Sequence, residues 1–343
     1  MKKKLIYLTV ISLGLMAFAS CKKDEKPADT VDEIRITFDA SAITVKIKLA
    51  GEGTATIDWG DGNAENATLA DMDEEYEHTY ATLTGSKTIK ASGRKIKSLI
   101  CENNKTISLD VSKNPNLRYL SCFGNKLTSL DLSKNSELEV LNCGNNKLSH
   151  LDVSKNMKLW TIDCSANELT SINLGKNTVI ESLHCAMNKL TAINTSENIN
   201  IKQIYCPSNE LTSLDVTKNT KLESLQFANN SLTSIDLSKN TKLVHLNCSD
   251  NSLTSLDVSK NTDLDDLDLT FNQISSLDVS ANTKLARLSC SVNNFSANAL
   301  DDLFTSLHSN TLPGVVKQIF IGGNPGISGC HTSIATLKGW TVA

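Results

Sequence analysis

Cysteine recurs at one fixed interval through the middle of this 343-residue chain. Six cysteines stand 21 residues apart and two more keep the same phase after gaps: Cys101, Cys122, Cys143, Cys164, Cys185, Cys206, Cys248 and Cys290. Thiols in a regular series can pair as disulfides, ligate a metal, act as nucleophiles or pack in a core. The choice among these depends on the structure that repeats every 21 residues.

The column of positions that holds these cysteines is an apolar one. Phe227 and Leu269 take the two places where cysteine is missing, and free cysteine itself packs as a small hydrophobe. In parallel strands about 4.8 Å apart, Cys248 and Cys290 are separated by ~9.6 Å, beyond the ~7 Å limit for the Cα atoms of a disulfide. A straight row of thiols also makes no tetrahedral zinc site. We therefore expect packing rather than disulfide, metal or redox chemistry, and no cofactor.

Other reactive residue types form no recognisable catalytic set. The six histidines lie in no zinc-protease or serine-hydrolase motif. The nearest group is Asp163, His184 and Tyr205, which stand 21 residues apart and so fall in one column. A regular surface brings such residues together without any catalytic role, and no oxyanion site is evident. We expect a protein that is not an enzyme.

The repeated unit predicts the fold. From Leu109 to Ala297 the chain divides into nine units of 21 residues, and a partial unit precedes them. Within a unit, Leu120 and Cys122 alternate with outward positions, and this period of two indicates a strand with one buried face. A single unit cannot bury that face alone, whereas a stack of units can.

Inside each unit lies the pattern L-x-x-L-x-C-x-x-N-x-L, for example from Leu117 to Leu127. The pattern resembles leucine-rich repeats, and its restatement within the unit resembles the nested 21-residue class called IRREKO-type. Bacterial surface proteins of the BspA-like and internalin-like kinds carry comparable arrays. The resemblance covers about 200 residues. It implies a mostly β, right-handed leucine-rich-repeat solenoid with a parallel sheet.

Two columns of the repeat are filled by asparagine. The first holds Asn104, Asn125, Asn146, Asn167, Asn188, Asn209, Asn230, Asn251, Asn272 and Asn293. The second holds Asn114, Asn135, Asn156, Asn177, Asn198, Asn219, Asn240, Asn261 and Asn282. An amide side chain can donate and accept hydrogen bonds, so a stacked column can satisfy backbone groups at the turns of a tight coil. We expect both columns to be structural ladders.

Charge follows the repeat as well. Seven units carry Asp at one position, from Asp110 to Asp278, and lysine stands three residues later in most units. Aspartate can bond backbone N–H groups a few residues on, and neighbouring rows of opposite sign lower the repulsion within each row. We interpret these columns as a solvated, self-compensated edge. A charged docking face is the alternative.

The N-terminal residues indicate export. Three lysines precede an apolar run that ends in small residues before Cys21, which is the layout of a signal peptide. "FAS" before Cys21 resembles the lipobox of bacterial lipoproteins, and the resemblance implies lipidation of Cys21. The following Lys-Asp-Glu run resembles a surface-export tag. We expect a signal peptide over 1–20, a tether over 21–33, and a lipid anchor in the outer membrane that leaves the protein facing the cell exterior.

Both ends of the array differ from its repeats. Residues 34–93 contain strand-like runs, and "IDWGDG" with the later "HTY" resembles the PKD β-sandwich, so we predict a PKD-like β cap. Asp58, Asp61, Asn63 and Glu65 depart from the calcium-loop pattern, which favours a structural turn over a calcium site. The repeats then span 94–297, and residues 298–343 resemble the α/β C-terminal cap of such arrays.

A binding role remains. The formal net charge is −4, or about −7 without the three lysines of the signal peptide (31 basic against 38 acidic), so nucleic acid is not an expected partner. We expect a monomer that contacts membrane only through its anchor and presents the sheet to a protein ligand, with glycan capture as the alternative. The candidate ligand face comprises Tyr119, Phe123, Trp160, Asp163, His184, Tyr205, His245 and Arg287.

Overall fold

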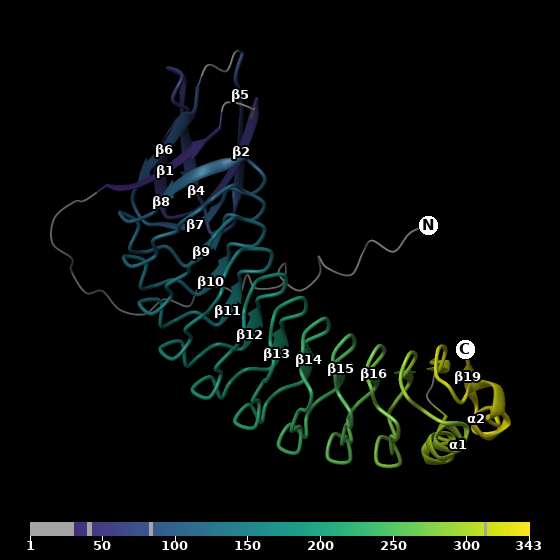
Figure 1. The fold of residues 1–343 in the computed structure, drawn as a ribbon. Coiled ribbons are helices and arrows are strands. Elements are labelled where there is room, and N and C mark those ends of the chain that lie inside the picture. Colours follow the sequence, from purple (N-terminus) through teal and green to yellow (C-terminus); the bar gives the residue numbers. More distant parts are fainter. Residues whose placement is uncertain (1–30, 40–42, 82–84, 312–313) are drawn as a thin grey trace.

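A computed structural model describes residues 31–39, 43–81, 85–311 and 314–343. The chain forms a curved solenoid with a two-layered β region at its N-terminal end and a small helical region at its C-terminal end (Figure 1). The short solenoid strands line the inner side of the curve, and the turns of each coil form the outer side. We call these the concave face and the convex wall.

The N-terminal layers are built from alternating strands. One layer is a five-stranded sheet in the order β4-β3-β6-β1-β8. In β1 every second residue is buried, as expected for a strand with one face against a core. The strands of this sheet are β1 (Asp32–Phe38), β3 (Gly53–Asp58), β4 (Ala64–Leu69), β6 (Lys87–Gly93) and β8 (Thr106–Asp110).

The second layer continues directly into the solenoid. Strands β2 (Thr44–Gly51) and β5 (Glu74–Thr79) pair antiparallel, and β2 also pairs antiparallel with β7 (Ile96–Ile100). The strand β7 then pairs in parallel with β9, the next strand of a 14-stranded sheet. The N-terminal region therefore covers the first coil with its own strand, which removes an exposed apolar end.

Each solenoid coil contributes one three-residue strand in strict register. Leu120 aligns with Leu141, and Leu141 with Ile162, so the inward side chains stack in straight columns. The strands are β9 (Tyr119–Ser121), β10 (Val140–Asn142), β11 (Thr161–Asp163), β12 (Ser182–His184), β13 (Gln203–Tyr205), β14 (Ser224–Gln226), β15 (His245–Asn247), β16 (Asp266–Asp268) and β17 (Arg287–Ser289).

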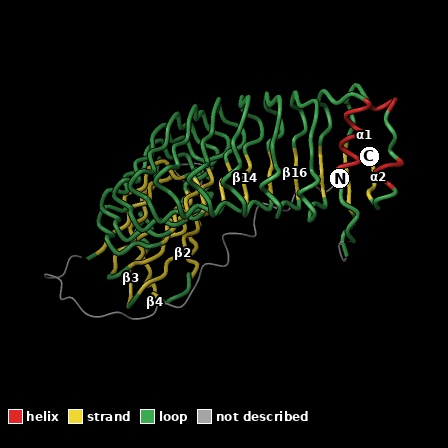
Figure 2. Tube along the Cα trace, turned by 90° about the horizontal axis from the view of Figure 1, so that it is seen from below, coloured by secondary structure: helices red, strands yellow, loops and turns green. Residues whose placement is uncertain are grey.

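The C-terminal cap closes the other end of the stack. It comprises α1 (Ala297–Ser306), β18 (Lys317–Phe320), the 3₁₀ turn η1 (Ile327–Gly329), α2 (Ser333–Thr336) and β19 (Trp340–Val342). Leu300, Leu303 and Phe304 are the buried face of α1. The ammonium of Lys317 donates to the carbonyl oxygens of Asn310 (2.9 Å) and Lys338 (2.7 Å). Among the described residues, helices occur only in this cap (Figure 2).

The predicted fold class is confirmed. The chain is a mostly β leucine-rich-repeat solenoid with a parallel sheet, a β-sandwich-like N-terminal region and an α/β C-terminal end. One detail was not anticipated: β8, which contains Leu109 at the start of the first full unit, pairs with β1 in the N-terminal sheet. Within the described ranges, no helix has both the length and the apolar character needed to cross a membrane.

Candidate functional site

The cysteine column lies in the core. All eight of its cysteines are buried and unpaired. Burial raises the pKa of the Cys122 thiol to about 12, and burial also raises the pKa of Cys185, with Cys206 adding to the effect. A thiol that stays protonated at neutral pH is a poor nucleophile and metal ligand. The packing role predicted from Phe227 and Leu269 agrees with this burial.

The first asparagine column satisfies backbone groups on two neighbouring coils. The Nδ2 of Asn188 donates to the carbonyl oxygens of Cys164 (3.0 Å) and Cys185 (3.2 Å). Its Oδ1 accepts from the backbone N–H of Leu169 at 3.0 Å. The same three kinds of bond recur along the column, for example at Asn146. These amides link each coil to the one before it.

In most asparagines of the second column, the amide nitrogen forms hydrogen bonds and the amide oxygen does not. The Nδ2 of Asn135 donates to the carbonyl oxygens of Val111 (2.9 Å) and Asn114 (2.8 Å). Its Oδ1 is buried and has no hydrogen-bond partner among the described residues. The same holds for Asn156, Asn177, Asn198, Asn240, Asn261 and Asn282. The sequence predicted a ladder here, but it did not predict that the acceptor would be left over.

The aspartate column holds the turns of the convex wall. The carboxylate of Asp131 accepts from the backbone N–H of Ser133 at 2.9 Å. This hydrogen bond lowers the pKa of Asp131. Asn173 and Asn194 make the corresponding bond with their Oδ1 atoms, to Gly175 and Ser196. The predicted structural role of the column therefore needs only an acceptor oxygen.

The residues of the candidate ligand face fall into columns on the concave face. Tyr119, His245 and Arg287 occupy one strand position. Asp163, His184 and Tyr205 occupy another, on three consecutive coils. Phe123 lies beside the end of the strand, with its ring against Gly144. The structure thus brings together Asp163, His184 and Tyr205 on consecutive coils, but it spreads the full set along the sheet from β9 to β17 (Figure 1).

The column around His184 is a packed polar cluster. The Nε2 of His184 lies 3.2 Å from the hydroxyl of Ser182, and its ring meets Tyr205 edge-on at 5.7 Å between centroids. Burial lowers the pKa of His184, with the negative charge of Asp163 acting in the opposite direction. Asp163 itself accepts from the backbone N–H of Ser165 at 2.9 Å. Among the described residues Asp163 forms no ion pair with His184, so the cluster lacks the orienting bond of a catalytic triad.

The acidic end of the face, which comprises Asp263, Asp265, Asp266 and Asp268 around β16, is largely paired. His245 lies 2.9 Å from Asp265, and Arg287 lies 3.6 Å from Asp266. Burial raises the pKa of Asp266 despite the nearby Arg287. Sequence analysis missed Phe320, whose ring lies 5.6 Å below the Arg287 guanidinium. Phe320 lies in the C-terminal cap, beyond the 21-residue units, so comparing the units does not reveal it.

Trp160 stands out in its column. The residue is 38% exposed, between Glu139 and Glu181 on the coils before and after it. Four further apolar residues are exposed on the same and the next two coils: Met157, Val179, Met187 and Ile199. At the positions of Met157, Val179 and Ile199, most other coils have Thr, Ser or charged residues. Comparing units within the chain would have revealed these exposed residues.

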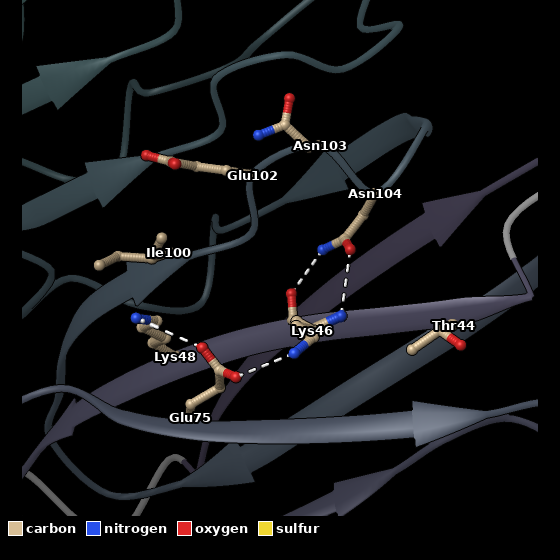
Figure 3. A pocket seen from close by; sticks show the side chains of 8 residues that line it. All are labelled: Thr44, Lys46, Lys48, Glu75, Ile100, Glu102, Asn103 and Asn104. Carbon is tan, nitrogen blue, oxygen red and sulfur yellow. Dashed lines mark hydrogen bonds and ion pairs between the residues drawn. The ribbon is translucent and has the colours of Figure 1, made fainter. Parts of the chain in front are cut away.

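A hollow of about 410 Å³ marks the N-terminal end of the concave face. Its lining residues are Thr44, Lys46, Lys48, Glu75, Ile100, Glu102, Asn103 and Asn104. Lys46 and Lys48 pair with Glu75 at 3.2 and 3.4 Å, and Asn104 bonds the backbone of Lys46 (Figure 3). The charges of the hollow mostly satisfy one another, so it serves to join the N-terminal layers to the first coil.

The carboxylates between Asp58 and Glu65 are engaged by nearby groups of the N-terminal region. Asp58 accepts from the backbone of Gly60 at 2.9 Å, and Asp61 lies 2.7 Å from His78. Glu65 accepts from the Trp59 ring nitrogen at 3.1 Å. No group of three or more His, Cys, Asp or Glu in the described ranges is placed to hold a metal ion. The predicted lipidation site, Cys21, lies outside the described residues.

Comparison with known proteins identifies the fold. No protein-family model and no curated protein matches the chain. Among solved structures it is similar to the functional domain of InlJ from Listeria monocytogenes, which includes a cysteine ladder, with 30% identity, a TM-score of 0.65, and 76% of this chain and 56% of that chain covered. A leucine-rich-repeat protein of Leptospira interrogans, LIC12759, shares 22% identity at a TM-score of 0.61, over 71% of this chain and 64% of its own.

YopM from Yersinia enterocolitica is also similar, with 24% identity, a TM-score of 0.54, and 68% of this chain and 47% of that chain covered. The chain thus spans 56% of the InlJ domain and 64% of the Leptospira protein. What these structures share with it is the stack of parallel strands and turns described above. The chain has the fold of a bacterial leucine-rich-repeat solenoid.

Proposed function

We propose that this chain is a non-enzymatic binding protein of the cell surface that presents its concave face to a protein partner in adhesion or cell interaction. The observation that carries the proposal is the contrast between the two sides of each strand. The inward columns hold the same apolar types on every coil, whereas the outward positions change from Tyr119 to Asp163 to Arg287. Packing of the coil does not require that variety.

The chemistry of the face suits a protein partner. Trp160 and Tyr119 offer large rings, and Arg287 is held over Phe320. Aromatic residues and arginine dominate the binding energy of protein interfaces. The likeness to the functional domain of InlJ, at 30% identity, supports an interaction or adhesion role. The lipobox-like "FASC" supports attachment through Cys21 to the outer membrane, with the repeats facing outward.

The proposal is tested by capture with matched variants. The purified chain is incubated with detergent extracts of candidate target cells, and bound proteins are quantified by mass spectrometry. We expect at least one protein to be captured by the wild type and by the convex-wall variant Lys155→Ala, but to be lost with Tyr119→Ala or Trp160→Ala. Proteins that are retained by both concave variants and lost with the convex variant would contradict the proposed surface.

A further inference from the structure

The convex wall contains one place where the repeat departs from its own pattern. Three columns, which begin at Asp110, Ser112 and Lys113, hold Asp, Ser and Lys in most of the nine units. Thr217 is a conservative change in the serine column. Five other positions depart: Asn173, Gly175, Asn194, Glu197 and Ala281. The first four lie in two consecutive units, and all four line one hollow of about 250 Å³, together with Ile172 and Leu174.

The fold does not require these departures. Asn173 accepts the backbone N–H of Gly175 at 3.1 Å, and Asp131 makes the same bond to Ser133 at 2.9 Å. Either side chain therefore holds the turn. A Cβ added to Gly175 would meet only the Oδ1 of Asn173, at an ordinary 3.4 Å. Serine would fit there, as it does in most other units.

What the departures change is the chemistry offered to solvent. In Asn173 and Asn194 the Oδ1 atoms accept backbone N–H groups, which fixes the Nδ2 atoms as the outward groups. Neither Nδ2 has a hydrogen-bond partner among the described residues. At position 197 the carboxylate of glutamate stands where most other units have the ammonium of lysine. This carboxylate has no hydrogen-bond or ion-pair partner among the described residues. Gly175 leaves out a side chain and opens the space between them.

We propose that this hollow, defined by Asn173, Gly175, Asn194 and Glu197, binds one unit of a neutral saccharide. Two amide N–H groups on neighbouring coils match hydroxyl oxygens, and the Glu197 carboxylate matches a hydroxyl proton. Ile172 and Leu174 lie at the floor of the hollow, where both are buried, so the ligand is recognised through its hydroxyl groups.

Charge and size support a neutral, small ligand. Replacing Asp with Asn at two positions removes two negative charges, and replacing Lys with Glu at one reverses a positive charge. With Lys176 in the adjacent column, the site carries one charge of each sign, which favours neither phosphate nor a free cation. Pockets for drug-sized ligands hold roughly 300–1,000 Å³, so the hollow of about 250 Å³ takes a single sugar unit.

The repeat provides an unusually clean test. Asn194→Asp and Gly175→Ser each restore the residue found in most other units, so both variants should fold and melt like the wild type. Binding of the purified chain is measured on an array of neutral mono- and oligosaccharides and by saturation-transfer NMR. We expect the wild type to bind at least one saccharide and each variant to bind at least tenfold more weakly. Asp215→Asn, in a unit outside the hollow, is the control and should bind like the wild type.

Three results would overturn the proposal. They are the absence of binding to every neutral saccharide, equal binding by the Asn194→Asp, Gly175→Ser double variant, and loss of sugar binding with Tyr119→Ala on the concave face. If the hollow binds only the terminal unit of an oligosaccharide, the chain will bind oligosaccharides on the array and the free monosaccharide will not compete for this binding. The site is separate from the concave face, so its failure leaves the proposed protein partner untouched.

Discussion

The hydroxyl of Thr195 donates to the Oδ1 of Asn219 at 2.8 Å, in a column where the other coils have valine or leucine. Asn219 is accordingly absent from the series of second-column asparagines whose buried Oδ1 lacks a partner. A buried polar atom without a partner carries a desolvation cost. The chain thus contains one natural instance of the residue pair that satisfies this acceptor.

This pair predicts an unusual tolerance for threonine in the core. In Val153→Thr, the new hydroxyl would stand toward the Oδ1 of Asn177 as Thr195 stands toward Asn219, because the units are in register. Burying an unbonded hydroxyl costs about 1–3 kcal/mol, so we expect the free energy of unfolding to fall by less than ~1 kcal/mol at this site. Urea denaturation measures it. Val45→Thr, in the core of the N-terminal region, is the control and should lose the larger amount.

The first asparagine column should respond differently. In Asn188→Ala, the carbonyl oxygens of Cys164 and Cys185 and the N–H of Leu169 lose their partner. We expect a loss of about 1–3 kcal/mol in the free energy of unfolding, measured by urea titration. The control variant Thr178→Ala, at an exposed turn position, should change it little. If Asn188→Ala melts like the wild type, water reaches that column and the ladder is not its main support.

The cysteines should be reactive only after unfolding. Burial raises the pKa of every thiol in the column, to about 12 at Cys206. A thiol reagent at neutral pH should therefore label few ladder cysteines in the native protein and nearly all of them in denatured, non-reduced protein. Mass spectrometry counts the labels. Pairs of ladder cysteines that resist labelling until a reductant is added would show that disulfides form after all.

How much of this could be read from the sequence depends on which residues repeat. The inward columns, such as Leu120, Leu141 and Ile162, carry a signal that nine units reinforce, and the solenoid follows from it. The direction of a hydrogen bond leaves no such signal. The sequence does not indicate that Asn135 donates through its Nδ2 and leaves its Oδ1 without a partner among the described residues. The hollow beside Gly175 cannot be inferred from the sequence for another reason: Gly175 and Glu197 are 22 residues apart, and only the coil places them around one space.

Acid should destabilise the fold partly through His184. Burial lowers the pKa of His184 in the folded state, although Asp163 opposes the shift. Below the ordinary histidine pKa of about 6.5, the unfolded chain binds a proton that the folded chain refuses, so stability falls as pH falls from about 7 toward the lowered value. In His184→Gln, the slope of unfolding free energy against pH should be shallower in this window. His150→Gln, on an exposed turn, should keep the wild-type slope, and a slope unchanged in both variants would contradict the assignment.

Trp160 tests the protein-binding proposal most directly. Trp160 is 38% exposed between Glu139 and Glu181, and the backbone of its coil is held by main-chain bonds, including Trp160 N–H to the Glu139 carbonyl at 3.0 Å. The side chain can therefore be removed without breaking the ladder. Because buried aromatic anchors supply much of the affinity of an interface, we expect Trp160→Ala to weaken binding of a captured partner by ~2 kcal/mol or more, measured by calorimetry. Asp266→Ala, which removes a charge paired with Arg287, should chiefly alter the dependence of binding on salt, because exposed charges are screened. Equal affinity of Trp160→Ala and wild type would move the contact to the acidic end of the face or to the convex wall.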